Sequence, residues 1–285
     1  MIENKSDAVI LGGNIFSLYA GILLEKNGLN VTIIENDLYS SILENGPLFF
    51  INFEDEKRKM LNYRSKEIFK ELMRKNTREI IWPIDLFDRL KDKFSGKILN
   101  FSKFKEFFYD GIEISGIDAG LKISTNLVLV MDGILLKNFL NGKGYELKNY
   151  SFEFGNAVLM ASGKDNIYYF YNDYLFIKQG DTVFASTIWE NTKTNSFKKI
   201  LTKGYEIVPG LENSLVKRFW KNRHDLFPDS LPRIGNILYK NLYFMAGYSR
   251  FGISLGLELS RLLTQLALGK PLDMDIDSLK VIQST

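Results

Sequence analysis

The sequence predicts an α/β fold in which a parallel sheet is joined to an inserted antiparallel sheet. Three observations predict it. Residues 7–35 have the pattern of a strand, a glycine turn, a helix and a second strand, which is the repeating unit of a parallel sheet. Residues 167–188 are aromatic and β-branched runs broken by Asn172-Asp173 and Gly180-Asp181, which are hairpin signals. Strand 242–246, a glycine-rich loop and a helix close the chain, so both ends supply the α/β part.

The opening segment has the features of a dinucleotide-binding unit. Strand Ala8–Leu11 leads into Gly12-Gly13 and a helix, and a second strand, Asn30–Ile34, ends at Glu35. A tight first turn needs glycine, and a pyrophosphate binds the free N–H groups and the positive dipole end of the helix that follows. Glu35 lies close to the position, ~20 residues on, where an acid accepts hydrogen bonds from the ribose hydroxyls. The segment is therefore predicted to be Rossmann-like.

The glycine fingerprint is altered. The pattern G-x-G-x-x-G would place glycines at 12, 14 and 17, whereas the chain has Gly12, Asn14 and Ser17. Serine is small enough for the close packing of helix on strand. The Asn14 side chain is expected to crowd the approach of a pyrophosphate. On this motif alone, a βαβ unit that binds nothing remains an alternative.

Composition excludes several classes of protein. The chain has 285 residues, enough for one large or two small cores, and 37 basic against 34 acidic residues, too balanced for a nucleic-acid surface. The absence of cysteine excludes disulfides, thiolate metal sites and cysteinyl flavin links. The single histidine, His224, is too few for a histidine metal cluster and a weak basis for a triad, so no metal is expected. Without an apolar run of about 18 residues or a signal peptide, we expect a cytoplasmic protein with no membrane span.

Between the two ends, the predicted elements follow in order. Residues 36–50 form a polar loop that passes the dinucleotide. Residues 55–76 form an amphipathic surface helix, and 84–108 form further short helices. Residues 127–131 are apolar, and 134–140 form a short helix.

The next apolar strand, Ala157–Ala161, runs into Ser162-Gly163. A buried strand that ends in small residues is typical of a parallel central sheet, with a ligand at its carboxyl end. A helix at 195–208 ends at Pro209-Gly210, and a turn covers 228–232. The predicted domains are a nucleotide domain of residues 1–50, 140–166 and 219–285, and a substrate domain of residues 51–139 and 167–218.

Five stretches resemble the FAD-dependent D-amino-acid oxidase family, and most closely its glycine oxidase and sarcosine oxidase branch. They are DAVILGGNIFS…VTIIE, Ser40-Ser41…Asn45-Gly46, NAVLMASG, LFIKQGDTVFASTIWE and FWKNRHDLFPDSLPRIG…NLYFMAGYSRFGISLG. Residues 50–130 match poorly, and the chain is expected to be a shortened member. The resemblance implies a FAD-binding Rossmann-like domain of the glutathione-reductase type with an inserted antiparallel-sheet substrate domain.

The glycines and the helix of the last stretch also indicate, by their chemistry alone, a site for a flat ring. Gly247 and Gly252 let the backbone pass close to a flat ring, and the helix that starts near Ile253 presents unpaired N–H groups to it. A helix N-terminus stabilises the negative charge that develops at the N1/C2=O edge of a reduced flavin. A structural strand, loop and helix that close the sheet remain the alternative.

The resemblance also implies roles for single residues. Arg250 corresponds to a substrate-facing arginine, and Arg223 lies one residue out of register with an arginine that pairs with the substrate carboxylate. Tyr248 replaces a common histidine of the family; it can donate a hydrogen bond but is no base at neutral pH. His224 is interpreted as an exposed residue. The predicted cofactor-binding residues are Gly12, Gly13, Asn14, Ile15, Glu35, Ser41, Asn45, Gly46, Ser162, Gly163, Gly247, Arg250, Phe251, Gly252 and Ile253.

The implied reaction is the oxidation of a small amine or amino acid by noncovalently bound FAD. A hydride passes from Cα to flavin N5, and the imine that forms is hydrolysed by water. A tyrosine of the inserted sheet, Tyr169, Tyr171 or Tyr174, is expected to add a hydrogen bond to the substrate. Three alternatives remain: a dehydrogenase subunit that passes electrons to another acceptor, an NAD(P)-dependent reductase, and a non-catalytic member without cofactor. Both a homo-oligomer and a hetero-oligomer are compatible with the sequence.

Overall fold

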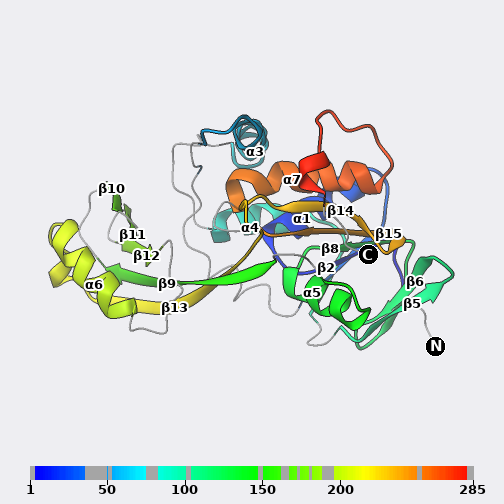
Figure 1. The fold of residues 1–285 in the computed structure, drawn as a ribbon, viewed down its shortest axis with the longest axis horizontal. Helices are drawn as coiled ribbons and strands as arrows, with labels where there is room; N and C mark the ends of the chain where they lie inside the picture. Colours follow the sequence, from blue (N-terminus) through cyan, green and yellow to red (C-terminus); the bar gives the residue numbers. More distant parts are fainter. Residues whose placement is uncertain are drawn as a thin grey trace.

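The structure is a computed structural model that describes residues 4–35, 50, 53–74, 83–100, 104–146, 150–161, 167–171, 174–179, 182–187, 196–248 and 252–280. The chain forms two parts that lie side by side (Figure 1). One part holds both ends of the chain and most of the helices. The other is a five-stranded sheet with one helix. None of the helices in the described ranges is long and apolar enough to cross a membrane.

The centre of the first part is a six-stranded sheet. In sheet order its strands are β14 (Arg233–Ile237), β15 (Tyr239–Ala246), β8 (Leu127–Val130), β2 (Ala8–Leu11), β3 (Val31–Glu35) and β4 (Lys97–Asn100). All neighbouring pairs are parallel except β14 and β15. Every residue of β2, β3 and β8 is buried, which is why these strands are nearly continuous apolar runs. The predicted opening unit is confirmed, with α1 (Ile15–Glu25) between β2 and β3.

Side chains of the central strands alternate between two apolar cores. Ile10 and Ile33 belong to the core that contains α1 and α7 (Gly252–Ala267), whereas Val9 and Ile34 belong to the core on the other face. Figure 1 shows α1 and α7 on one side of the sheet, with α4 (Pro83–Lys91) beside them and α3 (Glu56–Met73) above. The other face is covered by α5 (Gly133–Gly142) and a four-stranded sheet, β1 (Asn4–Lys5), β7 (Lys122–Ser124), β6 (Glu113–Asp118) and β5 (Glu106–Asp110).

The predicted run of short helices over 84–108 is only partly right. Pro83–Lys91 is helical, but Lys97–Asn100 pairs with β3 and Glu106–Asp110 pairs with β6. Spaced phenylalanines suggested helical faces there. In β5 they instead follow the two-residue period of a strand, since Phe107 is buried and Phe108 is only half-buried.

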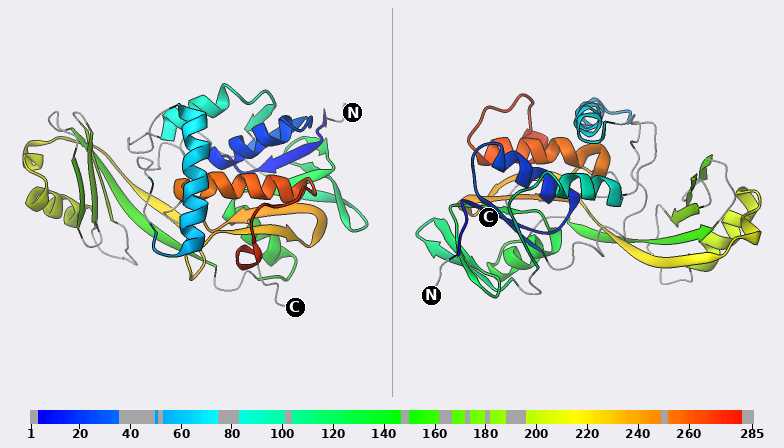
Figure 2. Two further views of the ribbon diagram at one scale, coloured as in Figure 1. Left: turned by 90° about the horizontal axis from the view of Figure 1, so that it is seen from above. Right: turned by 180° about the vertical axis from the view of Figure 1, so that it is seen from behind.

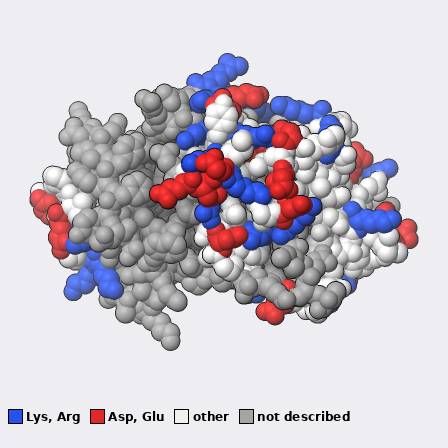
Figure 3. All heavy atoms as spheres, turned by 45° about the horizontal axis from the view of Figure 1, so that its top comes forward, with Lys and Arg blue, Asp and Glu red and all other residues white. Residues whose placement is uncertain are grey.

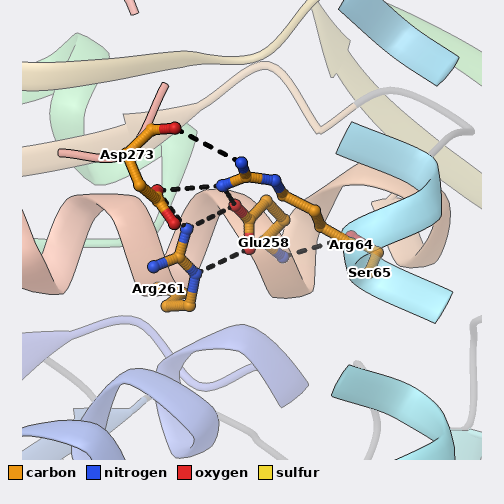
Figure 4. A network of polar contacts seen from close by, with 5 residues as sticks. All are labelled: Arg64, Ser65, Glu258, Arg261 and Asp273. Atoms are coloured by element: carbon orange, nitrogen blue, oxygen red, sulfur yellow. Dashed lines mark hydrogen bonds and ion pairs between the residues drawn. The ribbon is translucent and has the colours of Figure 1, made fainter. Parts of the chain in front are cut away.

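A cluster of charged side chains fastens α3 to α7 and to the segment after α7 (Figure 4). Glu258, which is 1% exposed, accepts two hydrogen bonds from Arg261, at 2.6 and 2.7 Å, and one from Arg64 at 3.2 Å. Both arginines also contact Asp273, at 2.7 and 2.9 Å. The Glu258 N–H donates to the Ser65 hydroxyl on α3. This cluster, together with apolar packing, holds α3 across α7 (Figure 2).

Acidic and basic side chains are interleaved on the surface that carries α3 (Figure 3). Two lysines of α3 pair with a carboxylate three residues away, Lys59 with Glu56 and Lys70 with Glu67, and Lys280 pairs with Asp277 in the same way. The mixture agrees with the balanced net charge. It gives this face no single-sign field of the kind that attracts a polyanion.

The second part is an antiparallel sheet in the order β10 (Ile167–Tyr171), β11 (Tyr174–Gln179), β12 (Thr182–Thr187), β9 (Ser151–Ala161) and β13 (Val216–Leu226). The predicted hairpins of residues 167–188 are therefore present. Helix α6 (Ser196–Ile207) and η1 (Leu211–Asn213) pack on this sheet through a small core of their own. The long paired strands β9 and β13 connect the two parts, and both views in Figure 2 show this connection. The last element in the described residues is η3 (Asp277–Leu279), where the Ser278 hydroxyl accepts from Lys57 of α3.

One strand was assigned to the wrong sheet. Ala157–Ala161 was predicted to lie in the parallel sheet, but it is the end of β9 and pairs antiparallel with β12 and β13. The strand beside β2 is β8. Both segments are short apolar runs, and periodicity alone does not tell a parallel strand from an antiparallel one. The predicted domain ranges stay a prediction, with β8 in the first part and β9 in the second.

Candidate functional site

The turn after β2 is shaped by glycine. Gly12 has φ +116°, and a Cβ at this position would lie 2.9 Å from the carbonyl carbon of Met131. The Gly12 N–H donates to Ile34 O, and the Met131 N–H donates to Leu11 O at 2.7 Å. The ends of β2, β3 and β8 are thus pressed together, and only a residue without a side chain fits the turn between them.

Asn14 closes this turn as the N-cap of α1. Its backbone is extended, with φ −145° and ψ 172°, as is usual at this position. The side-chain Oδ1 accepts from the Ser17 N–H at 2.8 Å and from the Ser17 hydroxyl at 3.1 Å. The Nδ2 donates to Met131 O at 2.8 Å. Asn14 therefore bridges the start of α1 and the end of β8.

Glu35 ends β3 at the same edge of the sheet, and it is 7% exposed. Leu11 and Ile34 are paired in the ladder, so the Gly12 turn and the Glu35 carboxylate belong to neighbouring strand ends. The carboxyl edge of a parallel sheet is where α/β folds bind ligands. A carboxylate and a helix N-terminus at this edge are the two groups that an adenosine diphosphate needs.

The loop after β15 returns to this edge. Gly247 has φ +79°, and a Cβ there would lie 2.5 Å from the Phe227 ring. The Tyr248 ring stacks on Phe16 of α1, with centroids 5.0 Å apart and planes 13° apart. Phe16 also fills the space left by Gly252 and Gly256 of α7, where added Cβ atoms would lie 3.4 and 2.5 Å from its ring. The predicted meeting of the first and last glycine turns is present in the fold.

Tyr248 points toward the Gly12 turn. Its hydroxyl donates to Met131 O at 3.3 Å, the same carbonyl that Asn14 contacts. Burial raises the pKa of Tyr248 well above its usual value; the charges of Asp225 and Asp132 add to this, and a hydrogen bond with Asn14 acts against it. The phenol therefore stays neutral at physiological pH and can only donate or accept a hydrogen bond.

A second junction, which the sequence did not predict, lies behind this loop. Asp225, near the end of β13, accepts from the Tyr150 hydroxyl and from the Gly247 N–H with the same oxygen, both at 2.7 Å. Burial, followed by the charge of Asp225 and the bond to it, raises the pKa of Tyr150 above its usual range. A Cβ at Gly133 would lie 1.8 Å from the Tyr150 hydroxyl. The only sequence signal was the Met131-Asp132-Gly133 run after an apolar strand.

This junction sets the geometry between the two parts of the molecule. Tyr150 immediately precedes β9, and Asp225 belongs to β13, the two strands that connect the parts. Asp132 caps α5 by accepting from the N–H groups of Ile134 and Leu135. The Asp225 carboxylate therefore fastens the base of the five-stranded sheet to the start of the Gly247 loop.

Other predicted site residues are only partly described. Ser41, Asn45, Gly46, Ser162, Gly163, Arg250 and Phe251 lie outside the described residues. Ser162 and Gly163 follow β9, so the reason for assigning them to the cofactor, a strand of the parallel sheet, was wrong. The backbones of Arg223 and His224 pair with Phe154 and Glu153 in the five-stranded sheet, and those of Tyr169, Tyr171 and Tyr174 belong to β10 and β11. No cluster of potential metal ligands occurs in the described part of the chain.

The residues present fit an adenine dinucleotide. Gly12 keeps the turn tight and Glu35 closes the neighbouring strand. The first N–H groups of a helix have no partner within it, and Asn14 satisfies that of Ser17. The N–H groups of Ile15 and Phe16, which precede it in α1, are placed for a phosphate. Asn14 is the departure from this fit, because its side chain lies across the same helix end.

Comparisons with known proteins agree with this geometry. Residues 142–266 match the family model described as DAO, FAD dependent oxidoreductase. This part of the chain, just under half of its residues, is similar to the FAD-dependent oxidoreductase family. This confirms the predicted resemblance, and the predicted cofactor and enzyme class are those of the matched family. A comparison with curated protein sequences finds no match.

Solved structures show the same fold over nearly the whole chain. L-proline dehydrogenase from P. horikoshii has a TM-score of 0.79 at 19% identity, with 98% of this chain and 97% of that chain covered. Glycine oxidase from Geobacillus kaustophilus has a TM-score of 0.82 at 16% identity, covering 99% and 100%. L-amino acid deaminase from Proteus vulgaris has a TM-score of 0.82 at 12% identity, covering 98% and 97%. At these identities the likeness extends the fold assignment to residues before 142.

Proposed function

We propose that this protein oxidises a small amine or amino acid with FAD held noncovalently between the Gly12 turn and the Gly247–Gly252 loop. The observation that carries the proposal is the meeting of these two turns at the carboxyl edge of the sheet, through Asn14, Met131 and Tyr248. The similar structures named as a proline dehydrogenase and a glycine oxidase support an amino acid as substrate.

When bound, FAD would supply the redox chemistry by accepting a hydride from the substrate Cα, which leaves a protonated imine for hydrolysis by water. The chain's own contribution is binding and orientation. Glu35 accepts hydrogen bonds from the ribose hydroxyls, and the first N–H groups of α1 donate to the diphosphate. The N-terminus of α7 provides positive potential where negative charge develops. No side chain need remove a proton if the amine is bound in its neutral form.

Two arginines are proposed to receive the substrate carboxylate. Arg250 stands between Tyr248 and Gly252 in the chain, and Arg223 belongs to β13, which runs toward the Asp225 junction. A guanidinium offers a planar pair of donors that matches a carboxylate. Tyr248 is a less suitable substrate contact than the resemblance implied, because its hydroxyl is engaged by Met131 O.

The visible spectrum of the purified protein tests the proposal. We expect absorbance near ~450 nm from an oxidised isoalloxazine ring, and bleaching of this band when a small amino acid is added without air. Reoxidation in air would identify an oxidase, and slow reoxidation would favour a dehydrogenase that uses another acceptor. A colourless protein that takes up no FAD would refute the proposal and leave a non-catalytic member of the family.

A further inference from the structure

The Asn14 side chain uses all of its polar atoms where a diphosphate is expected. Its oxygen accepts from the Ser17 N–H and hydroxyl, and its nitrogen donates to Met131 O. The oxygen thus holds a donor of the first turn of α1 in the way that a phosphate oxygen would. The two residues before it are glycines, so Asn14 carries the first side chain beyond β2.

The neighbours of Asn14 hold this arrangement in place. Met131 O accepts from both the Asn14 amide and the Tyr248 hydroxyl. Tyr248 is in turn stacked on Phe16, the second residue of α1. Asn14 and Tyr248 thus share the Met131 carbonyl beside the start of α1. The Asn14 carboxamide therefore already occupies the Ser17 N–H, a donor of the first turn that a ligand phosphate would use.

We propose that Asn14 is an internal competitor of the cofactor diphosphate: its carboxamide covers the phosphate-binding end of α1 and must turn away before FAD binds. The inference rests on the proposed function, since it concerns FAD. When the Asn14 side chain turns away, the Ser17 N–H exchanges the Asn14 oxygen for a phosphate oxygen, with little net change in free energy. The bond from Asn14 to Met131 O is lost without replacement. An ordinary hydrogen bond of this kind corresponds to about a tenfold change in affinity.

The test compares the binding of ADP, FAD and riboflavin to cofactor-free protein and its variants by titration. Asn14→Gly removes the competing carboxamide, and glycine is tolerated at an N-cap with little loss of helix stability. We expect ADP and FAD to bind about tenfold more tightly and to associate faster, and riboflavin, which has no diphosphate, to be unaffected. Asn27→Gly is the matched control, because Asn27 follows the other end of α1, where its amide donates to Leu23 O.

A second variant keeps the test decisive if Asn14→Gly folds poorly. Asn14→Ser retains a cap for the Ser17 N–H, but its side chain is too short to reach Met131 O, so tighter ADP binding is again expected. Equal or weaker binding of ADP and FAD by folded Asn14 variants would overturn the competitor role and leave the proposed function standing. Tighter ADP binding without any FAD binding would support the competitor role and overturn the proposed function. Failure of every variant to bind ADP would overturn both.

Discussion

Removing the Glu258 carboxylate is the perturbation for which the structure gives the clearest magnitude. Glu258 is 1% exposed and accepts three hydrogen bonds from Arg261 and Arg64. Removing one partner of a buried ion pair costs roughly 3–5 kcal/mol, because the other partner is left uncompensated. Here the arginine side chains are 21% and 26% exposed and keep Asp273 as a partner, so the lower end of that range applies. We expect Glu258→Ala to lower the free energy of unfolding by about 3 kcal/mol.

The assay is urea unfolding followed by far-ultraviolet circular dichroism, with the slope of the transition checked for each variant. For a chain of this size, about 3 kcal/mol also corresponds to a fall in Tm of roughly 6–12 °C. Glu67→Ala is the matched control. Glu67 also pairs with a basic residue three positions away, but its side chain is 49% exposed, so we expect a loss below about 0.5 kcal/mol.

Glu258→Gln separates charge from packing. The amide keeps the volume and one acceptor, so an intermediate loss is expected if the ion pairs stabilise the contact of α3 with α7. A loss below about 1 kcal/mol for Glu258→Ala, with an unchanged denaturant slope, would refute the reasoning. It would mean that the arginines reach solvent and Asp273 without cost, and that apolar packing alone holds α3 in place.

The remaining predictions concern the junction and acid stability. Gly133→Ala places a methyl group 1.8 Å from the Tyr150 hydroxyl, so it should break the Tyr150–Asp225 bond and lower the free energy of unfolding in urea by about 2 kcal/mol. The control is Gly142→Ala, in the same helix with open space around it, which should be neutral or stabilising by up to about 1 kcal/mol. Equal effects of the two substitutions would contradict this account. The bond from Arg261 lowers the pKa of Asp273 below its usual value; burial opposes this, and the bond from Arg64 adds to it. Because the folded pKa is the lower one, this stabilisation is present above the unfolded pKa of about 3.9 and is lost as the pH falls through the folded value. Asp273→Asn should therefore show a shallower loss of stability with acid in unfolding experiments from neutral pH downward, and a slope equal to that of the unchanged protein would exclude the effect.

The local pattern of the sequence was enough to predict the opening unit. Its apolar strands, the Gly12 turn and the acid at Glu35 are encoded within one short segment, where spacing determines which groups share an edge. The hairpins of residues 167–188 were predictable for the same reason, because turn residues and two-residue alternation are local signals. The match of the DAO family model agrees with the resemblance drawn from the C-terminal stretches.

The tertiary structure alone decided which apolar strand lies beside β2. Leu127–Val130 and Ala157–Ala161 are alike as sequences, and the choice depends on what each strand packs against. The same holds for the contacts that shape the site. Asn14 meets Met131 across 117 positions of the chain, and Tyr150 meets Asp225 across 75. A side chain's own neighbours in sequence do not specify a partner at that separation, because closing the loop between them depends on the folding of everything in between.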